Sequence, residues 1–227
     1  MNIGAIIQAR MSSARFPGKV LYKISGKPIL QYTIDRLQQL HGLKTIVVAT
    51  SREESDDKIE QYCYKNDIQC YRGSLDDVAA RFKQIVEDYR LDAFVRVCGD
   101  SPLIDHSVIN TGIDIFKEAS YDIVTNTLVR TYPSGQSIEI LRSDTFCTAY
   151  PLMKEDDELE HVTKYFYKYK DDFKIFNMVS EENYGEMKLS VDTEDDMIII
   201  ENIVSKMVRP HYEYTLTDIY DIYKNIK

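Results

Sequence analysis

The sequence lacks the features that mark several large classes of protein. Its four cysteines include no Cys-x-x-Cys pair, so their spacing does not fit a zinc site and buried thiols are expected. No apolar run approaches the roughly 20 residues of a membrane-spanning helix. Residues 1–2 lead directly into an apolar run, without a secretory leader. We therefore expect a cytoplasmic globular protein with no membrane partner.

An excess of positive charge is also missing. The chain has 37 acidic residues against 28 Lys and Arg, which gives a net charge of −9. A protein that coats DNA or RNA is usually basic, so a nucleic-acid polymer is not the expected partner. The length of 227 residues, with 44% hydrophobic and 29% charged residues, suits one domain over residues 1–227.

Acidic residues are absent from the whole amino-terminal stretch, where Asp35 is the first. Within this stretch an apolar run, 3–7, predicts a buried strand. The polar loop that follows carries Arg10, Arg15 and Lys19. A basic loop without acids, in an acidic protein, indicates an anion site, although a solvated loop with scattered charges is the alternative. It is not a P-loop, because the Gly-x4-Gly-Lys-Ser/Thr pattern is missing.

Strands and helices alternate over residues 1–120, which predicts an α/β fold with a mostly parallel central sheet flanked by helices. Right-handed crossovers then bring the carboxyl ends of the strands to one edge, where ligands bind. After residue 121 the alternation loosens, and a mixed extension over about 121–180 is expected to cover the site or form a dimer interface. The expected strands are 3–7, 45–50, 68–71, 93–98, 123–126, 138–141, 173–179 and 187–191, and one helix is expected over 156–169.

Two aspartates follow predicted strands: Asp100 comes after 93–98 and Asp192 after 187–191. If both strands are parallel members of the sheet, the carboxylates reach the same edge and can hold Mg²⁺. The alternative is that each aspartate caps the helix that follows it. The two acids further along, Asp195 and Asp196, are expected to serve the helix dipole, and Asp195 is the better candidate of the two for supporting the site residues from behind.

Two further stretches carry weaker signals. The Gly in Arg72-Gly73-Ser74 lets a backbone approach a flat ligand, whose edge Arg and Ser can bond, but a plain turn is nearly as good an interpretation. The segments 132–139 and 160–163 contain isolated acids and a histidine, which are more often ordinary surface or core residues.

Five stretches, in order, resemble the spore-coat-polysaccharide-biosynthesis subfamily of the sugar-nucleotide cytidylyltransferases, the group that includes the CMP-KDO and CMP-sialate synthetases. The resemblance implies a nucleotide-diphospho-sugar transferase fold of the glycosyltransferase-A-like type. The stretches are IIQARMSSARFPGKVL, RGSLDD, RVCGDSPLID, TYPSGQSIEI and the pair EHVT and LSVDTEDD.

The resemblance also implies roles for individual residues. Arg10, Lys19, Asp100 and Asp192 would be catalytic, and Asp100 and Asp192 would hold Mg²⁺. The nucleotide would bind Ala9, Arg10, Ser12, Arg15, Lys19, Arg72, Gly73, Ser74 and Asp100. The acceptor would meet Gln136, Glu139 and His161. The chain departs from the pattern at Gln136-Ser137, where Leu-Asp is more usual, and at Cys98, where the KDO enzymes carry Gln.

The implied activity is transfer of CMP from CTP to a sugar acid or related acceptor, with release of pyrophosphate. A glycosyltransferase is one alternative, but it would usually show Asp-x-Asp where this chain has Gly-Asp-Ser-Pro. A non-catalytic nucleotide-binding paralogue is the other. The sequence leaves the identity of the acceptor open.

Overall fold

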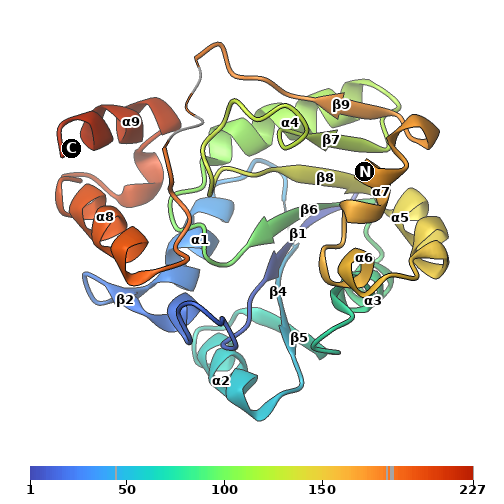
Figure 1. Cartoon of the computed structure of the whole chain (residues 1–227), viewed down its shortest axis with the longest axis horizontal. Helices are drawn as coiled ribbons and strands as arrows, with labels where there is room; N and C mark the ends of the chain where they lie inside the picture. Colours follow the sequence, from blue (N-terminus) through green and yellow to red (C-terminus); the bar gives the residue numbers. More distant parts are fainter. Residues whose placement is uncertain (44, 183, 185–186, 227) are drawn as a thin grey trace.

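A seven-stranded sheet forms the centre of the molecule (Figure 1). The computed structural model describes residues 1–43, 45–182, 184 and 187–226. The strand order is β5-β4-β1-β6-β8-β7-β9, and β8 alone runs against its neighbours in this described sheet. The strands are β1 (Ile3–Gln8), β4 (Thr45–Ser51), β5 (Gln69–Gly73), β6 (Ala93–Cys98), β7 (Ile123–Thr125), β8 (Glu139–Arg142) and β9 (Ile175–Asn177), beside a hairpin of β2 (Lys23–Ile24) and β3 (Lys27–Pro28).

Helices cover both faces of the sheet. Figure 1 shows α3, α5, α6 and α7 on one side and α1, α8 and α9 on the other. The described helices are α1 (Ile29–Leu37), α2 (Asp57–Lys65), α3 (Val78–Asp88), α4 (His106–Glu118), α5 (Ser143–Ala149), α6 (Asp156–Glu160), α7 (Lys164–Lys168), α8 (Glu194–Ser205) and α9 (Leu216–Lys224). The predicted α/β fold is therefore confirmed.

The two faces of β1 bury different side chains. Ala5 and Ile7 join a core with α1, α2 and α4, whereas Ile6 packs with α3 and with Phe146 of α5. A strand that is covered on both faces needs apolar residues at every position, which is why this stretch of the sequence is a continuous apolar run.

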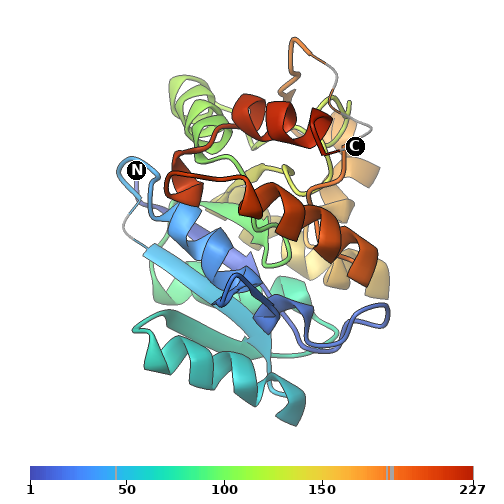
Figure 2. The ribbon, with the colours of Figure 1, turned by 90° about the vertical axis from the view of Figure 1, so that its left-hand side faces the viewer.

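The carboxyl-terminal helices form a third core with α1. Figure 2 shows α8 and α9 beside α1 in front of the sheet, and Ile200 and Ile219 are fully buried there with Ile29. Arg36 of α1 is also buried, and its guanidinium donates to the carbonyl oxygens of Ile104, His211 and Tyr214. These contacts fix the last part of the chain against the first.

Asp35 provides a test of this packing by pH. Burial alone would raise its pKa, but hydrogen bonds with His211, Gln31 and Lys27, together with the charge of Lys27, lower it to about 2 from an ordinary 3.8. A carboxylate whose pKa is lowered by folding stabilises the protein above its unfolded pKa, and this contribution is lost as the pH falls toward 2. We expect Asp35→Asn to cost up to about 2 kcal/mol of unfolding free energy near neutral pH.

Urea denaturation of the wild type and of Asp35→Asn between pH 6 and pH 3 measures this difference. The gap between the two proteins should narrow below about pH 4. Asp114→Asn, on the exposed face of α4, is the matched control and should differ little from the wild type. If the unfolding free energies of the wild type and Asp35→Asn differed by the same amount at every pH, the lowered pKa of Asp35 would be contradicted.

The structure corrects two of the expected elements. Residues 187–191 form no strand, and only an isolated parallel bridge joins Lys188 to Ser134. The helix expected over 156–169 is divided into α6 and α7, because Val162 has a φ of 32° between them. The extension over 121–180 contributes β7, β8 and β9 to the edge of the central sheet, and its role in a dimer stays a prediction.

The segment that leads to Asp192 crosses Gly135 closely. Gly135 has a φ of +90°, and a Cβ there would lie 2.5 Å from the carbonyl carbon of Leu189 and 2.6 Å from the nitrogen of Ser190. We expect Gly135→Ala to lower the unfolding free energy by about 2–4 kcal/mol, since it adds both backbone strain and a clash with backbone atoms.

Thermal unfolding checks this expectation. Gly42→Ala is the matched control, because Gly42 also has a positive φ of +73° but nothing lies within 4 Å of its added Cβ. Gly42→Ala should therefore lose only the stability that backbone strain at a positive φ costs. If Gly135→Ala and Gly42→Ala lost the same stability, the close approach of Leu189 and Ser190 to Gly135 would not contribute to the loss.

Candidate active site

The candidate site lies at the carboxyl ends of β1 and β6, the two central strands. Ala9 and Arg10 follow β1, and Gly99 and Asp100 follow β6. The amide of Gly99 donates to the carbonyl oxygen of Gln8 at 2.8 Å, which holds the two strand ends together. The side chains beyond them therefore share one edge of the sheet, the usual place for a ligand in a parallel sheet.

Lys19 is the centre of this arrangement. It begins a short 3-10 helix, η1 (Lys19–Leu21), and its side chain is only 10% exposed. Its ammonium donates to Asp100 Oδ2 at 2.6 Å, to the carbonyl oxygen of Val191 at 2.7 Å and to Asp192 Oδ1 at 3.1 Å. One buried cation thus brings together the two aspartates that lie far apart in the sequence.

The carboxylate of Asp192 is surrounded by positive charge. Besides Lys19, it pairs with Arg15 at 3.0 Å and with Lys188 at 3.2 Å. Burial alone would raise its pKa, but the hydrogen bond and charge of Lys19, followed by those of Lys188, lower the pKa below its ordinary value. Asp192 is therefore held as a carboxylate.

Asp196, rather than Asp195, orients Asp192. Asp196 Oδ2 accepts from the backbone amides of Asp192 and Thr193, both at 2.9 Å, and from Lys188 Nζ at 2.6 Å. Thr193 caps α8 and completes a capping box with Asp196. The expected preference for Asp195 was wrong, because the third residue of the helix faces back toward its cap.

A cavity of about 400 Å³ opens beside these side chains. A smaller one of about 150 Å³ lies next to it and shares Arg96, Cys98, Asp100 and Asp192. The larger cavity is lined by Gln8, Ala9, Arg10, Ser13, Ala14, Arg15, Lys19, Val20, Arg96, Cys98, Asp100, Glu160, His161 and Asp192. The two aspartates thus stand where the two spaces meet.

Most of the basic loop lines the larger cavity as expected. Ala9, Arg10, Arg15 and Lys19 all contribute, and so does Ser13, whereas Ser12 is exposed and outside the lining, and its nucleotide role stays a prediction. Arg10 donates to Glu160 at 2.9 Å. His161, also in the lining, keeps a side chain that is 55% exposed.

The segment Arg72-Gly73-Ser74 lies away from both of these cavities. The guanidinium of Arg72 bonds the carbonyl oxygens of Ser51 and Glu53 and pairs with Asp57 and Glu60. A Cβ on Gly73 would lie 2.4 Å from the side chain of Arg81. Ser74 accepts a hydrogen bond from the amide of Asp77. These contacts fit a structural turn, and the nucleotide role of the segment stays a prediction.

The three expected acceptor residues fall in different places. Gln136 is fully buried and bonds the backbone of Leu103 and Asp105, so its amide serves the fold. His161 lines the larger cavity. Glu139 lines the smaller one.

Arg96 and Glu139 form a buried ion pair at the base of the smaller cavity. Burial would raise the pKa of Glu139, but the charge of Arg96, with hydrogen bonds from Thr163 and Tyr167, lowers it. Burial favours the neutral form of Arg96, but Glu139 outweighs this effect and raises the pKa of the guanidinium. Both groups are therefore charged, and the Arg96 Nε has no partner among the described residues.

Asp100 and Asp192 fit a Mg²⁺ ion that is bound together with a ligand. Both carboxylates touch the same ammonium, so they stand close enough to share one small cation. Among the described residues, no group of three or more His, Cys, Asp or Glu is arranged so that it could hold a metal ion by itself. Mg²⁺ is commonly held by one or two carboxylates, with waters and phosphate oxygens in its remaining positions, and this donor set matches that chemistry.

Sequence reasoning missed three residues of the site. Lys188 lies outside the quoted stretches, and Asp196, which ends LSVDTEDD, was expected only to serve the helix dipole; the fold brings both to Asp192. Arg96 had a signal, because it is a charged residue within the apolar run of β6. Such a residue in a covered strand needs a partner, and one was available in Glu139.

A cytidylyltransferase family profile matches residues 4–213. The chain belongs to the cytidylyltransferase family. It is therefore a nucleotidyltransferase enzyme, and the resemblance predicted from its motifs is confirmed. Family membership also places it among nucleotidyl-transferring enzymes rather than glycosyltransferases.

The relatives of this cytidylyltransferase match over different lengths. An uncharacterized protein of Methanocaldococcus jannaschii is 32% identical over 198 residues, which cover 86% of this chain and 80% of the relative. The spore coat polysaccharide biosynthesis protein SpsF of Bacillus subtilis is 28% identical over 209 residues, 88% of this chain and 85% of SpsF. An 8-amino-3,8-dideoxy-manno-octulosonate cytidylyltransferase of Shewanella is 34% identical over 134 residues, 56% and 53% of the two chains.

Two solved structures support the fold. A cytidylyltransferase from Leptospira borgpetersenii superposes with a TM-score of 0.95 at 29% identity, over 100% of this chain and 95% of the other. A CMP:2-keto-3-deoxy-manno-octonic acid synthetase, complexed with CTP, gives 0.73 at 18% identity, over 91% and 99%. The second likeness shows a shared fold. In the described part of the chain no helix is long and apolar enough to cross a membrane.

Proposed function

We propose that this enzyme transfers CMP from CTP to a sugar acid or a related acceptor and releases pyrophosphate, in the biosynthesis of a surface polysaccharide or glycan. The observation that carries the proposal is the junction of two unequal cavities at Asp100, Lys19 and Asp192. The larger cavity has room for a nucleoside triphosphate, and the smaller one for part of an acceptor.

The basic loop would hold the triphosphate. Arg10 and Arg15 reach the larger cavity from the loop after β1, and their planar guanidinium groups suit phosphate oxygens. Lys19 is a point charge fixed by three acceptors, so it is already in place before a ligand arrives. Positive groups that need no rearrangement are the most effective at stabilising charge that develops in a transition state.

The reaction would be an in-line displacement. An acceptor oxygen attacks the α-phosphorus, its hydroxyl proton is released, and the bond between the α-phosphorus and the bridging oxygen breaks. The electron pair of that bond leaves with pyrophosphate. The protein aligns the two substrates and balances charge, without a covalent intermediate.

Asp100 and Asp192 would hold Mg²⁺, which when bound neutralises charge on the triphosphate and on the departing pyrophosphate. Lys19 keeps the two carboxylates together in the absence of substrate, although they repel each other. Lys188 and Asp196 would act as positioning residues, because they fix the carboxylate and the backbone of Asp192.

The smaller cavity is proposed for the acceptor. Four serines line it, together with Arg96, whose guanidinium is paired with Glu139. Hydroxyl walls suit a polyhydroxylated sugar, and a buried cation suits its acid group. The serines are Ser101, Ser134, Ser137 and Ser190.

A pyrophosphate-release screen tests this function. CTP, UTP, GTP and ATP would each be offered, with Mg²⁺, to a panel of sugar acids, neutral sugars and phosphorylated polyols. The expected result is release that requires both CTP and a sugar acid. Release with another nucleotide would overturn the CTP assignment, and release with phosphorylated polyols alone would overturn the sugar-acid assignment. A cytoplasmic location and a homodimer belong to the same proposal, and light scattering of the purified protein tests the dimer.

A further inference from the structure

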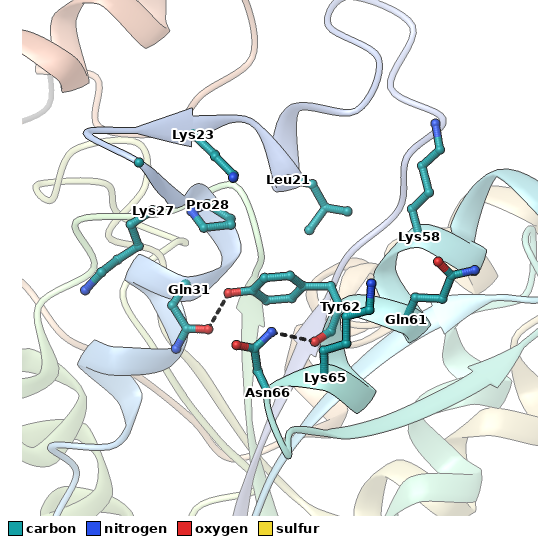
Figure 3. Close-up of a pocket in the computed structure, with 11 residues that line it drawn as sticks. Leu21, Lys23, Lys27, Pro28, Gln31, Lys58, Gln61, Tyr62, Lys65 and Asn66 are labelled. Carbon is teal, nitrogen blue, oxygen red and sulfur yellow. Dashed lines mark hydrogen bonds between the residues drawn. The ribbon is translucent and has the colours of Figure 1, made fainter.

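A cavity larger than either of the two at Asp100 lies outside the active site. It has a volume of about 570 Å³ and opens between α2, α1 and the β2–β3 hairpin (Figure 3). None of its residues lines either of the two cavities at Asp100. It is lined by Leu21, Lys23, Gly26, Lys27, Pro28, Gln31, Lys58, Gln61, Tyr62, Lys65 and Asn66.

The charge of this cavity is opposite to that of the protein. Four lysines line it and no acidic residue does, although the whole chain carries −9. Lys27 pairs with Asp35 at 2.5 Å. Within the described ranges, no carboxylate lies within 4.0 Å of Lys23, Lys58 or Lys65. Three lysines thus line one space without a counter-ion from the protein.

Helix α2 separates its charges by face. Lys58 and Lys65 lie two turns apart on the side that lines the cavity. Asp57 and Glu60 point to the other side, where both pair with Arg72. An ordinary solvated helix mixes its charges and pairs them along one face. Here the acids are held away from the lysines, so the positive potential of the cavity is not cancelled locally.

The walls of the cavity are already organised. The hydroxyl of Tyr62, on α2, donates to Gln31 Oε1, on α1, at 2.6 Å, and the Asn66 amide donates to the carbonyl oxygen of Tyr62 at 2.7 Å (Figure 3). Gln31 in turn donates to Asp35 at 2.6 Å. The two helices are therefore bridged across the base of the cavity, and a ligand would not have to order them.

We propose that this cavity is a second anion site that binds a small molecule with several phosphate charges. Lysine ammonium groups are compact point charges, which suit phosphate, and three of them balance a ligand of about three negative charges. Two sources share this chemistry, inorganic pyrophosphate and a nucleotide. The site does not depend on which acceptor the enzyme uses.

The position of the cavity connects it to the catalytic loop. Leu21, in its wall, ends the same 3-10 helix that begins with Lys19. Asp56, which precedes α2, accepts from the backbone amide of Met11 in the basic loop at 2.7 Å. Both walls of the cavity are thus joined to the loop that carries Arg10 and Arg15, and a bound anion would be adjacent to it without entering it.

A nitrogen-15 amide titration of the purified protein tests the site. Pyrophosphate and, separately, CTP would be added at constant ionic strength without Mg²⁺. The amides of Gly26, Gln61 and Asn66 report the second site, and those of Ser13 and Ala14 report the catalytic cavity. Saturable shifts of the first group are expected with at least one ligand, and the ligand that causes them identifies the source.

The variants decide the interpretation. Lys58→Gln/Lys65→Gln changes two exposed side chains and should weaken binding at the second site about tenfold or more, because two charge-assisted contacts are lost. Lys117→Gln/Lys174→Gln removes the same charge from exposed positions elsewhere and should not. The proposal fails if neither ligand shifts the first group of amides, or if the two double variants behave alike.

Discussion

Replacing Asp100 by Asn should reduce turnover at least about 1,000-fold while leaving the fold intact. The amide has the shape of the carboxylate but not its charge. Lys19 would lose the closer of its two carboxylate partners, at 2.6 Å, and Mg²⁺ would lose one of its two protein ligands. Pyrophosphate release measures the turnover, and circular dichroism with thermal unfolding shows that the fold is kept.

The control for this variant is Asp76→Asn. Asp76 is an exposed aspartate in the loop before α3, away from the cavities at Asp100. The same chemical change there should leave turnover within about twofold of the wild type. Full activity in Asp100→Asn would refute both the metal assignment and the catalytic role of this carboxylate.

Replacing Lys19 by Met should lower kcat/KM by about 100-fold to 1,000-fold. Methionine keeps the apolar stem of the side chain but leaves Asp100, Asp192 and the carbonyl oxygen of Val191 without their shared donor. The two carboxylates would then repel each other and attract a cation more strongly, so the Mg²⁺ concentration that gives half of the maximal rate should fall. Rates measured over a range of Mg²⁺ concentrations separate these effects.

Lys154→Met is the matched control for this experiment, because Lys154 has an exposed side chain in the loop before α6. It should behave as the wild type. If kcat/KM of Lys19→Met stayed within about threefold of the wild type, Lys19 would only hold distant segments together and would take no part in the reaction.

The parts of the fold that could be predicted are those where local sequence and burial agree. β1, β4 and β6 are covered on both faces, so each is a continuous apolar run that is recognisable without a structure. The basic loop and Asp100 follow such strands directly, and their places could be inferred from parallel-sheet geometry. The convergence of Lys19 with Asp100 and Asp192 was expected, and the structure places these three side chains in direct contact.

The parts that could not be predicted depend on contacts between distant segments. Residues 187–191 are apolar enough for a strand, but their backbone bonds single residues of other segments, as Leu189 does with Ser134 and Val191 with Asp100. Gln136 lies in a stretch that was expected to meet the acceptor, although it departs there from the usual pattern, and its amide completes the backbone bonds of a buried turn. A polar residue in a motif does not reveal whether its partner is a ligand or the chain itself.

The hydrogen bond between Lys19 and Val191 has a consequence for the order in which contacts can form during synthesis of the chain. The basic loop is synthesised before all three acceptors of its lysine: Asp100 follows Lys19 by 81 residues, Val191 by 172 and Asp192 by 173. A nascent chain can form β1 and its neighbours early, whereas the lysine of its basic loop lacks two of its three acceptors until Val191 and Asp192 have been added. The active site would therefore be completed only when these last residues are in place. Fragments that stop before residue 191 should fold in part and never turn over substrate.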